Sequence, residues 1–455
     1  MSSATASKKS IVVLGAGFGG LRAAKLLARG LLRHRLTGAG FGGLRAAKLL
    51  ARGLLRHRLT ARYAVYLIDK NPYHTYTPTL YEIATTSKET ANYLELKDIV
   101  AFDIPALIAG YPLTFVNDTV TALDLIGGDI HCVNTEMKFD YLVLAIGSET
   151  NYVDIPGLRA YALPLKSFMD AVRLRDTILE RATAVPAELR IIIGGGGSTG
   201  VELAGELECW FGELRAEARA FPRTSVTIVE GSPTVLSGFA PRMIAIATKR
   251  LQRIGVQLIV NERIVSAAKD TVTLQSGKTL PYDILVWTGG VKAASLMSVL
   301  PLKREEKGRV EAQNAMECLP QTEDLKLYGK IYGLGDAVCV FDPVTKKPVP
   351  LVARAALLQA DVAAENIIQD ILAFEHRTSA HAPRHYTPME YPYVVPIGGK
   401  YAVAKIGPFV FSGIVAWFFK GLIELYYLSS ILPFWKAVRA WFKGLRIFLA
   451  NDRLG

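Results

Sequence analysis

The feature that most restricts the fold of this chain is a glycine-rich loop between an apolar run and a helix-forming stretch, and it occurs twice. The runs IVVL at 11–14 and III at 191–193 are typical of buried strands. The glycines that follow them are Gly15, Gly17 and Gly20, and Gly195, Gly197 and Gly200. In a G-x-G-x-x-G loop they allow a tight turn, close approach of a pyrophosphate and close helix packing. The pattern predicts two dinucleotide sites, each with its phosphates at a helix N-terminus.

An acidic residue ends the next predicted strand in each case. Asp69 follows the apolar run 63–68, and Glu230 follows 226–229. A carboxylate at this position can accept hydrogen bonds from adenosine ribose hydroxyls, and it repels a 2′-phosphate. No arginine directly follows Glu230, so the second site is predicted to prefer NADH over NADPH.

Residues 15–37 are repeated letter for letter as residues 38–60. Copy one follows the strand-like run 11–14, whereas copy two follows RHRLT at 33–37, a poor buried strand. We therefore assign the phosphate loop to copy one. Copy two is expected between the first helix and the strand 63–68, as an insertion without function, because such connections tolerate added length.

Composition limits the class of protein. A chain of 455 residues, half of them hydrophobic, can form two or three domains. The net charge of +12 suits an anionic membrane surface or nucleic acid. No zinc-finger spacing or RNA-binding signature is present, so we expect neither a nucleic-acid partner nor a metal. The four cysteines are scattered without C-x-x-C. Residues 1–10 hold no apolar run, so we expect no secretory signal.

Three further segments read as strands that end in small or acidic residues. They are DYLVLAIG at 140–147, DILVWTGG at 283–290 and IYGLGD at 331–336. In this order, and with two dinucleotide loops, the chain resembles the flavoproteins with two dinucleotide-binding domains. The resemblance implies one bound flavin and one exchangeable nicotinamide.

The chain more closely resembles the type II NADH dehydrogenases. The matching segments are PYHTYTPTLYEIAT at 72–85, GSETN at 147–151, IPG at 155–157, GVELAGE at 200–206 and WTGGV at 287–291. The last is close to the family's W-T-A-G-V. Disulfide reductases need a redox dithiol, which this sequence does not offer.

The resemblance implies an α/β fold with two Rossmann-like domains and a C-terminal amphipathic helical segment that binds membranes. The expected parts are an FAD-binding domain at 9–185 and 301–390, an inserted NADH-binding domain at 186–300, and the C-terminal segment at 391–455. Residues expected to contact FAD are Gly15, Gly17, Gly20, Asp69, Ala145, Gly147, Gly335 and Asp336, the last at the ribityl–phosphate arm. Residues expected to contact NADH are Gly195, Gly197, Gly200, Glu230 and Gly290.

Candidate catalytic residues also follow from the resemblance. The family shows A-Q-x-x-x-Q beside the flavin, where quinone docks, but this chain has Arg354 at the first glutamine position and Leu358 at the second. Gln359 is one residue out of register, and Arg354 can instead pair with a nearby acid.

Two other residues are candidates for the flavin environment. Glu202 is a candidate for proton handling, or a carboxylate that suits the helix dipole. Lys400 is a candidate for the flavin's edge, or a solvated surface lysine.

The C-terminal segment lacks an uninterrupted run of the ~20 apolar residues that a spanning helix needs. Lys420 and Glu424 interrupt its best candidate, and residues 413–428 are expected to serve packing and dimerisation. After Pro433 the spacing predicts a basic amphipathic helix lying in the membrane interface. Its predicted apolar face is Trp435, Val438, Trp441, Phe442, Leu445, Phe448 and Leu449, opposite Lys436, Arg439, Lys443 and Arg446. The alternative is a helix packed on the protein's own core or on a dimer partner.

The resemblance implies hydride transfer from NADH to FAD and electron transfer from the flavin to a membrane quinone, without proton pumping. The expected location is peripheral, on the cytoplasmic face of a membrane. A sulfide:quinone reductase or a reductase for another acceptor is the alternative enzyme, and an FAD-binding scaffold with a vestigial redox role is the non-enzyme alternative.

Overall fold

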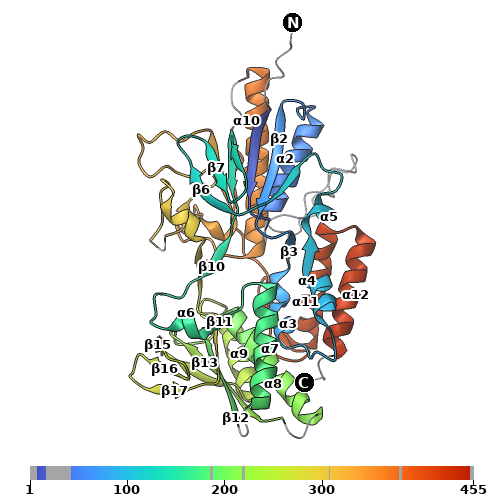
Figure 1. Ribbon diagram of the computed structural model, residues 1–455, viewed down its shortest axis with the longest axis vertical. Helices are drawn as coiled ribbons and strands as arrows, with labels where there is room; N and C mark the ends of the chain where they lie inside the picture. Colours follow the sequence, from blue (N-terminus) through green and yellow to red (C-terminus); the bar gives the residue numbers. More distant parts are fainter. Residues whose placement is uncertain are drawn as a thin grey trace.

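A computed structural model describes residues 8–16, 42–184, 188–217, 221–306, 308–378 and 382–450. Two parallel five-stranded sheets lie one above the other along the long axis of the molecule, and the last two helices lie beside their junction (Figure 1). The predicted α/β class with two Rossmann-like sheets is confirmed.

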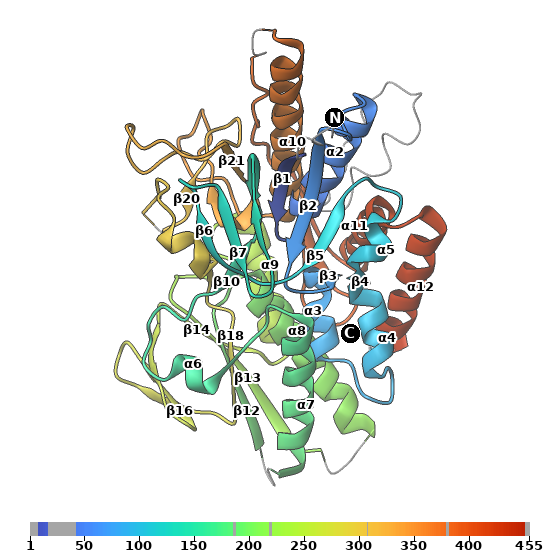
Figure 2. The ribbon, with the colours of Figure 1, turned by 45° about the horizontal axis from the view of Figure 1, so that its top comes forward.

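The first sheet has the strand order β21-β9-β1-β2-β5. Its strands are β1 (Lys9–Leu14), β2 (Tyr63–Asp69), β5 (Thr114–Asn117), β9 (Tyr141–Leu144) and β21 (Lys330–Gly333). Helix α2 (Gly42–Arg56) packs on β1 and β2, and the long α10 (Ala353–His376) packs on α2, as Figure 2 shows. Residues 11–14 are fully buried, as expected for a central parallel strand covered on both faces.

The second sheet repeats this order as β11-β18-β12-β13-β14. Its strands are β11 (Ala162–Pro164), β12 (Glu188–Gly194), β13 (Arg223–Glu230), β14 (Gln257–Val260) and β18 (Ile284–Trp287). Helices α7 (Phe168–Ala184), α8 (Ser198–Glu217) and α9 (Pro241–Arg253) accompany it. Strand β11 pairs with β18, so this sheet includes residues that precede the range 186–300 expected for the NADH-binding domain.

The chain crosses between the two sheets in paired segments. Strands β10 (Ser148–Thr150) and β19 (Val291–Ala293) run antiparallel to each other between the domains. The other short elements are β3 (Tyr73–Thr75), η1 (Thr77–Thr79), α3 (Leu80–Ala84), α4 (Tyr93–Val100), β4 (Ala101–Asp103), α5 (Ile104–Ile108), β6 (Val120–Asp124), β7 (Asp129–Cys132), β8 (Glu136–Lys138), α6 (Leu158–Tyr161), β15 (Ile264–Ala267), β16 (Thr271–Leu274), β17 (Thr279–Pro281), η2 (Ser295–Val299), β20 (Val310–Glu311), η3 (Gly335–Ala337) and β22 (Val338–Cys339).

The C-terminal region is a three-stranded sheet followed by two helices. Strands β23 (Tyr393–Pro396), β24 (Ala402–Ile406) and β25 (Phe409–Gly413) lead into α11 (Ile414–Ile431) and α12 (Phe434–Ala450). Helix α11 packs on the sheet and on α12, and α12 packs on α4. None of the helices in the described ranges is both long and apolar enough to cross a bilayer.

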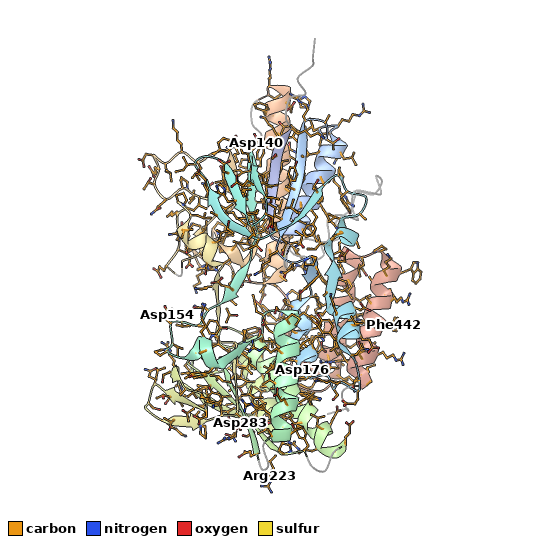
Figure 3. All side chains as sticks on the ribbon, in the orientation of Figure 1. Asp140, Asp154, Asp176, Arg223, Asp283 and Phe442 are labelled. Atoms are coloured by element: carbon orange, nitrogen blue, oxygen red, sulfur yellow. The ribbon has the colours of Figure 1, made fainter. Side chains whose placement is uncertain are left out.

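The predicted single apolar face of α12 is divided in the structure. Ala437, Gly444 and Ile447 are buried, and Trp441 and Phe448 pack inward beside them. Trp435, Phe442 and Leu449 are instead exposed, and Phe442 lies on the outer side of the helix in Figure 3. The prediction was incomplete because α11 and α4 cover part of the apolar face of α12. The helix therefore packs on the protein's own core and also presents an apolar surface outward.

Candidate cofactor and active site

The first nucleotide cradle forms where β1 ends. Gly15 has a φ of +94°, and a Cβ built on it would lie 2.5 Å from the carbonyl oxygen of Ala145. A Cβ on Gly43, at the start of α2, would lie 2.0 Å from the carbonyl oxygen of Gly15. Asp69 accepts a hydrogen bond from the backbone N–H of Ala16 at 2.6 Å, and burial raises its pKa. The strand, the helix and the acid therefore meet as a dinucleotide site requires.

The repeat contributes to this cradle differently from our prediction. Helix α2 belongs to copy two, and Gly43 is the counterpart of Gly20 one repeat later. Gly17 and Gly20 lie outside the described residues, so their predicted contacts stay predictions. The expectation that copy two is only an insertion between the first helix and β2 is wrong, because helix α2 of copy two packs on β1 and β2.

The way in which the two copies join β1 and β2 explains why the helix of copy two packs on β1. Strand β1 and Gly15 are joined to copy one, whereas the turn into β2 is joined to copy two. The backbone N–H of Leu59 donates to the carbonyl of Leu54 in α2, and the N–H groups of Arg62 and Tyr63 donate to the carbonyl of Leu59. These bonds fasten the turn to the last residues of α2. Joining the front of copy one to the helix of copy two keeps both junctions.

The second cradle repeats the first. Gly195 has a φ of +113°, and a Cβ on Gly200 would lie 2.0 Å from the carbonyl oxygen of Gly195. Glu230, at the end of β13, accepts a hydrogen bond from the N–H of Gly196 at 2.6 Å. The same steric fit and the same acid-to-loop hydrogen bond therefore recur at the carboxyl end of each sheet.

Two predicted glycines of the second site border open space. A Cβ on Gly197 or on Gly290 would meet no heavy atom within 4 Å. A side chain at either position would extend into the space beside the loop, and Gly290 also has a φ of +139°, which disfavours other residues. The cradle thus leaves room for a nucleotide where the two glycines lie.

The predicted flavin-binding turn at η3 is held by a hydrogen-bonded chain that the sequence did not reveal. Lys166 donates from Nζ to Ser148 Oγ at 2.9 Å, and Ser148 Oγ donates to Asp336 at 2.7 Å. Burial lowers the pKa of Lys166, and the nearby charge of Asp336 opposes this shift. Gln359 accepts a hydrogen bond from the N–H of Gly335 at 2.8 Å. This glutamine, one residue out of register with the family's motif, therefore contacts the η3 turn.

Of the other predicted FAD contacts, Ala145 and Gly147 follow directly after β9, which neighbours β1 and β21 in the sheet. Their position at the carboxyl ends of these strands agrees with the usual ligand crevice of such folds.

Glu202 lies on the first turns of α8 and is partly buried. Burial raises its pKa to about 8, with Glu82 adding to the rise and Lys420 opposing it. A helix N-terminus alone would lower this pKa, so desolvation outweighs the helix dipole.

The turn that carries Lys400 lies against α8. Gly398 and Gly399 have φ values of +67° and +62°, and a Cβ on Gly205 would lie 2.7 Å from the nitrogen of Gly398. Arg250 fixes the turn by donating to the carbonyls of Ile397 and Gly398 at 3.2 and 3.1 Å. Lys400 is partly buried, and its turn reaches α8 less than one helical turn from Glu202.

Arg354 begins α10 and is partly buried. Within the described ranges it forms no ion pair with a carboxylate, so the alternative of an acid partner is not supported. Its charge instead acts on Tyr391, whose pKa is raised by burial and lowered by the hydrogen bond with Tyr386 and by Arg354.

Arg263 is a further residue that sequence reasoning missed. A Cβ on Gly231 would lie 3.0 Å from Arg263 Nε, so this exposed guanidinium lies over the residue that follows Glu230. No motif in the sequence marked it. The pairing of β13 with β14 in the structure brings the segment after β14 back to Glu230.

The residues present fit FAD in the first cradle and a nicotinamide dinucleotide in the second. Each cradle combines glycines that cannot carry a side chain with a carboxylate placed for ribose hydroxyls, and Asp336 adds a second acid near the first. Fold and site together define an oxidoreductase with two dinucleotide-binding domains.

Comparison with known proteins agrees with this class. The chain belongs to the pyridine nucleotide-disulphide oxidoreductase family, whose model matches residues 36–360. The match begins just before copy two, as the position of α2 suggests. The chain is 28% identical to a type II NADH:quinone oxidoreductase of Mycobacterium tuberculosis over 92% of this chain and 84% of that protein. It is 27% identical to a demethylphylloquinone reductase of Synechocystis over 67% and 71%.

Among solved structures, NDH2 from Plasmodium falciparum in complex with NADH has a similar fold. The two superpose with a TM-score of 0.77 at 16% identity, covering 99% of this chain and 100% of that one. The resemblance includes the C-terminal region as well as both sheets.

Proposed function

We propose that this chain oxidises NADH through bound FAD and passes the electrons to a membrane quinone, without proton pumping. The observation that carries the proposal is the pair of matched cradles, one in each domain. Helix α8, which begins at the second cradle, packs against α3 of the first domain and against the turn that carries Lys400. Relatives named as NADH:quinone oxidoreductase and demethylphylloquinone reductase support quinone as the acceptor.

The chain's own residues bind and orient the cofactors in this proposal. FAD supplies hydride acceptance and electron transfer when it is bound. Asp69 holds its adenosine ribose, and Asp336, fixed by Ser148 and Lys166, holds its ribityl–phosphate arm. Glu230 holds the ribose of NADH. Burial raises the pKa of Glu202 to about 8, so this residue carries a proton at neutral pH and can supply it for the reaction.

The alternative of sulfide oxidation needs reactive cysteines at the flavin. None of the chain's four cysteines forms a disulfide. Cys339 is buried, and Arg309 donates to its Sγ at 3.4 Å. Cys318 is also buried, and burial raises the pKa of its thiol, which disfavours the reactive thiolate. These features favour NADH over sulfide as the electron donor.

We also propose that α11 and α12 dock the enzyme on the anionic cytoplasmic surface of a membrane, with residues 413–428 able to join two copies. The outward surface of the two helices exposes Phe418, Leu422, Trp435, Phe442 and Leu449. Lys436, Arg439 and Arg446 are exposed on α12 beside this surface. Aromatic and basic side chains together suit the headgroup boundary.

Stopped-flow spectroscopy of the FAD-loaded protein tests the function. NADH should bleach the flavin absorbance, and ubiquinone or menaquinone analogues should restore it. A flavin that NADH reduces but that neither quinone reoxidises would exclude quinone as the acceptor. A flavin that NADH does not reduce would exclude NADH as the donor.

A further inference from the structure

A charged cluster lies inside the protein where α3, α8 and α11 approach one another. Lys420 on α11 donates from Nζ to both carboxylate oxygens of Glu82 on α3, each at 2.6 Å. The two side chains are 13% and 6% exposed. Glu424, one turn further along α11, is 7% exposed. The cluster therefore places two carboxylates and one ammonium group out of water.

The same three side chains line a cavity of about 150 Å³ between α11 and α12. The rest of its wall is apolar and aromatic, with Trp417, Trp441 and Phe448 among the lining residues. A cavity of this size can hold several water molecules at its polar end. It thus offers a route by which protons reach the buried acids from the C-terminal helices.

Stability alone does not account for these charges. Removing an ion pair from water costs several kcal/mol per ion, and apolar residues of similar volume often stabilise a protein as well or better. A single lysine also cannot neutralise two carboxylates. One of the two carboxyl groups therefore has no matching cation within the cluster. A carboxyl group in this position, at the edge of a cavity, is suited to bind and release a proton.

We propose that Glu424, Lys420 and Glu82 form a proton inlet that leads from the cavity between α11 and α12 to Glu202 on α8. The inference rests on the proposed function, in which NADH, one proton from the medium and a quinone give NAD⁺ and a quinol. The hydride carries the electron pair, and the second hydrogen of the quinol is the proton taken up from the medium. It enters at Glu424, passes through the Lys420–Glu82 pair and leaves from Glu202 towards the acceptor.

The surroundings of the cluster shift the pKa of Glu424 towards neutral pH and keep Lys420 charged. The titratable groups that face Glu424 and Lys420 are Tyr76, Tyr81, Glu82, Glu202 and Glu206. Burial raises the pKa of Glu424 to about 7, with Lys420 opposing and Glu82 adding to the rise. Burial alone would lower the pKa of Lys420, but the charges of Glu82 and Glu424 raise it, so the lysine stays charged.

The test compares Glu424→Gln with Asp98→Asn in the FAD-loaded protein. Asp98 pairs with Lys443 on the protein surface at 2.8 Å, so its variant is a matched loss of one acid beside a lysine, away from the cavity. Electrons can be drawn off by a quinone analogue, which takes up protons, or by ferricyanide, which does not. We expect Glu424→Gln to slow reoxidation by quinone roughly tenfold or more. Reoxidation by ferricyanide should stay unchanged, and Asp98→Asn should change neither rate.

Difference infrared spectroscopy gives a readout that does not depend on turnover. The carboxylic acid carbonyl band of the wild-type protein should titrate near neutral pH, and Glu424→Gln should remove one component that Asp98→Asn retains. Equal slowing with both acceptors, or an unchanged infrared titration in Glu424→Gln, would overturn the inlet. A wild-type protein that reduces ferricyanide but no quinone would overturn the proposed function instead, while the infrared titration still decides whether Glu424 exchanges a proton near neutral pH.

Discussion

At the residue scale, the two copies of the repeat provide a matched pair of positions. Arg45 in α2 forms an ion pair with Asp361 on α10 that is largely buried. Arg22 is its counterpart in copy one and lies outside the described residues. We expect Arg45→Ala to lower the free energy of unfolding by up to about 3 kcal/mol, because it removes the cation of a largely buried ion pair.

Chemical denaturation of both variants checks this prediction. Arg22→Ala should unfold at the same denaturant concentration as the unmodified chain. The reverse order, with Arg22→Ala the less stable variant, would show that the helix of copy one packs on α10.

Nucleotide selectivity also depends on single residues. Glu230→Gln keeps an acceptor for the N–H of Gly196 but removes the charge that repels a 2′-phosphate. We expect the ratio of flavin reduction rates with NADH and NADPH to fall by roughly tenfold, since one such charge contact contributes about 1–2 kcal/mol.

Arg263 supplies the control for this experiment. Because its guanidinium lies over Gly231, it should bind the 2′-phosphate once Glu230 is neutral. Adding Arg263→Ala to Glu230→Gln should therefore remove much of the gain with NADPH. Equal reduction by both nucleotides in the wild-type protein would contradict the assignment of Glu230.

At the scale of elements, α12 serves packing and an outward surface at once. Truncation before Pro433 would remove the buried residues Ala437, Gly444 and Ile447 and expose the core that they cover. Substitutions of exposed residues therefore test membrane binding more cleanly. Trp435 and Phe442 are 78% and 58% exposed. Changing both to Ser should weaken binding to anionic liposomes several-fold, because apolar burial contributes about 25 cal/mol per Å².

Co-sedimentation with liposomes measures this effect. Val344 is 86% exposed in the segment between β22 and α10, outside α11 and α12. Val344→Ser is therefore the control substitution. High salt should release the wild-type protein only in part, since salt screens the basic residues but not the apolar contact. Unchanged sedimentation of the double variant would show that α12 is not the anchor.

At the scale of the whole molecule, one repeat should be dispensable. Deleting residues 15–37 or 38–60 gives the same product chain, which keeps strand β1, one glycine loop, one helix and the turn into β2. We expect this shorter protein to bind FAD at least as well and to melt no lower, because it keeps the junctions to both β1 and β2. Loss of flavin on deletion would show that the extra residues contribute to the site.

The buried acids should make stability depend on pH. Glu424 and Glu202 have folded-state pKa values of about 7 and about 8, above the ordinary value of 4.5. As pH rises above 4.5 the unfolded chain releases protons that the folded chain retains, so stability falls until the folded groups also titrate. The loss can reach about 1.4 kcal/mol per pH unit for each group.

Urea denaturation at pH 5, 6 and 7 measures this slope. The double variant Glu202→Gln/Glu424→Gln should show a flatter dependence than the wild-type protein in that range. Parallel slopes for the two proteins would mean that neither carboxyl group retains its proton in the folded state.

The sequence by itself determined the second cradle, the acids of both cradles and the class of protein. These features depend on short spacings, because a loop of glycines between a strand and a helix, with an acid closing the next strand, works through local backbone geometry. Gly195, Gly200 and Glu230 therefore lie where the pattern predicts them.

Only the tertiary structure decided which copy of the repeat packs on β1. The two copies have identical letters and thus identical local propensities, so the choice rests on their junctions to β1 and β2. The sequence likewise did not predict the contact of Lys166 with Ser148, or that of Lys420 with Glu82 across 338 residues. No periodicity relates residues that distant, and their meeting is fixed only when the sheets and the C-terminal helices pack together.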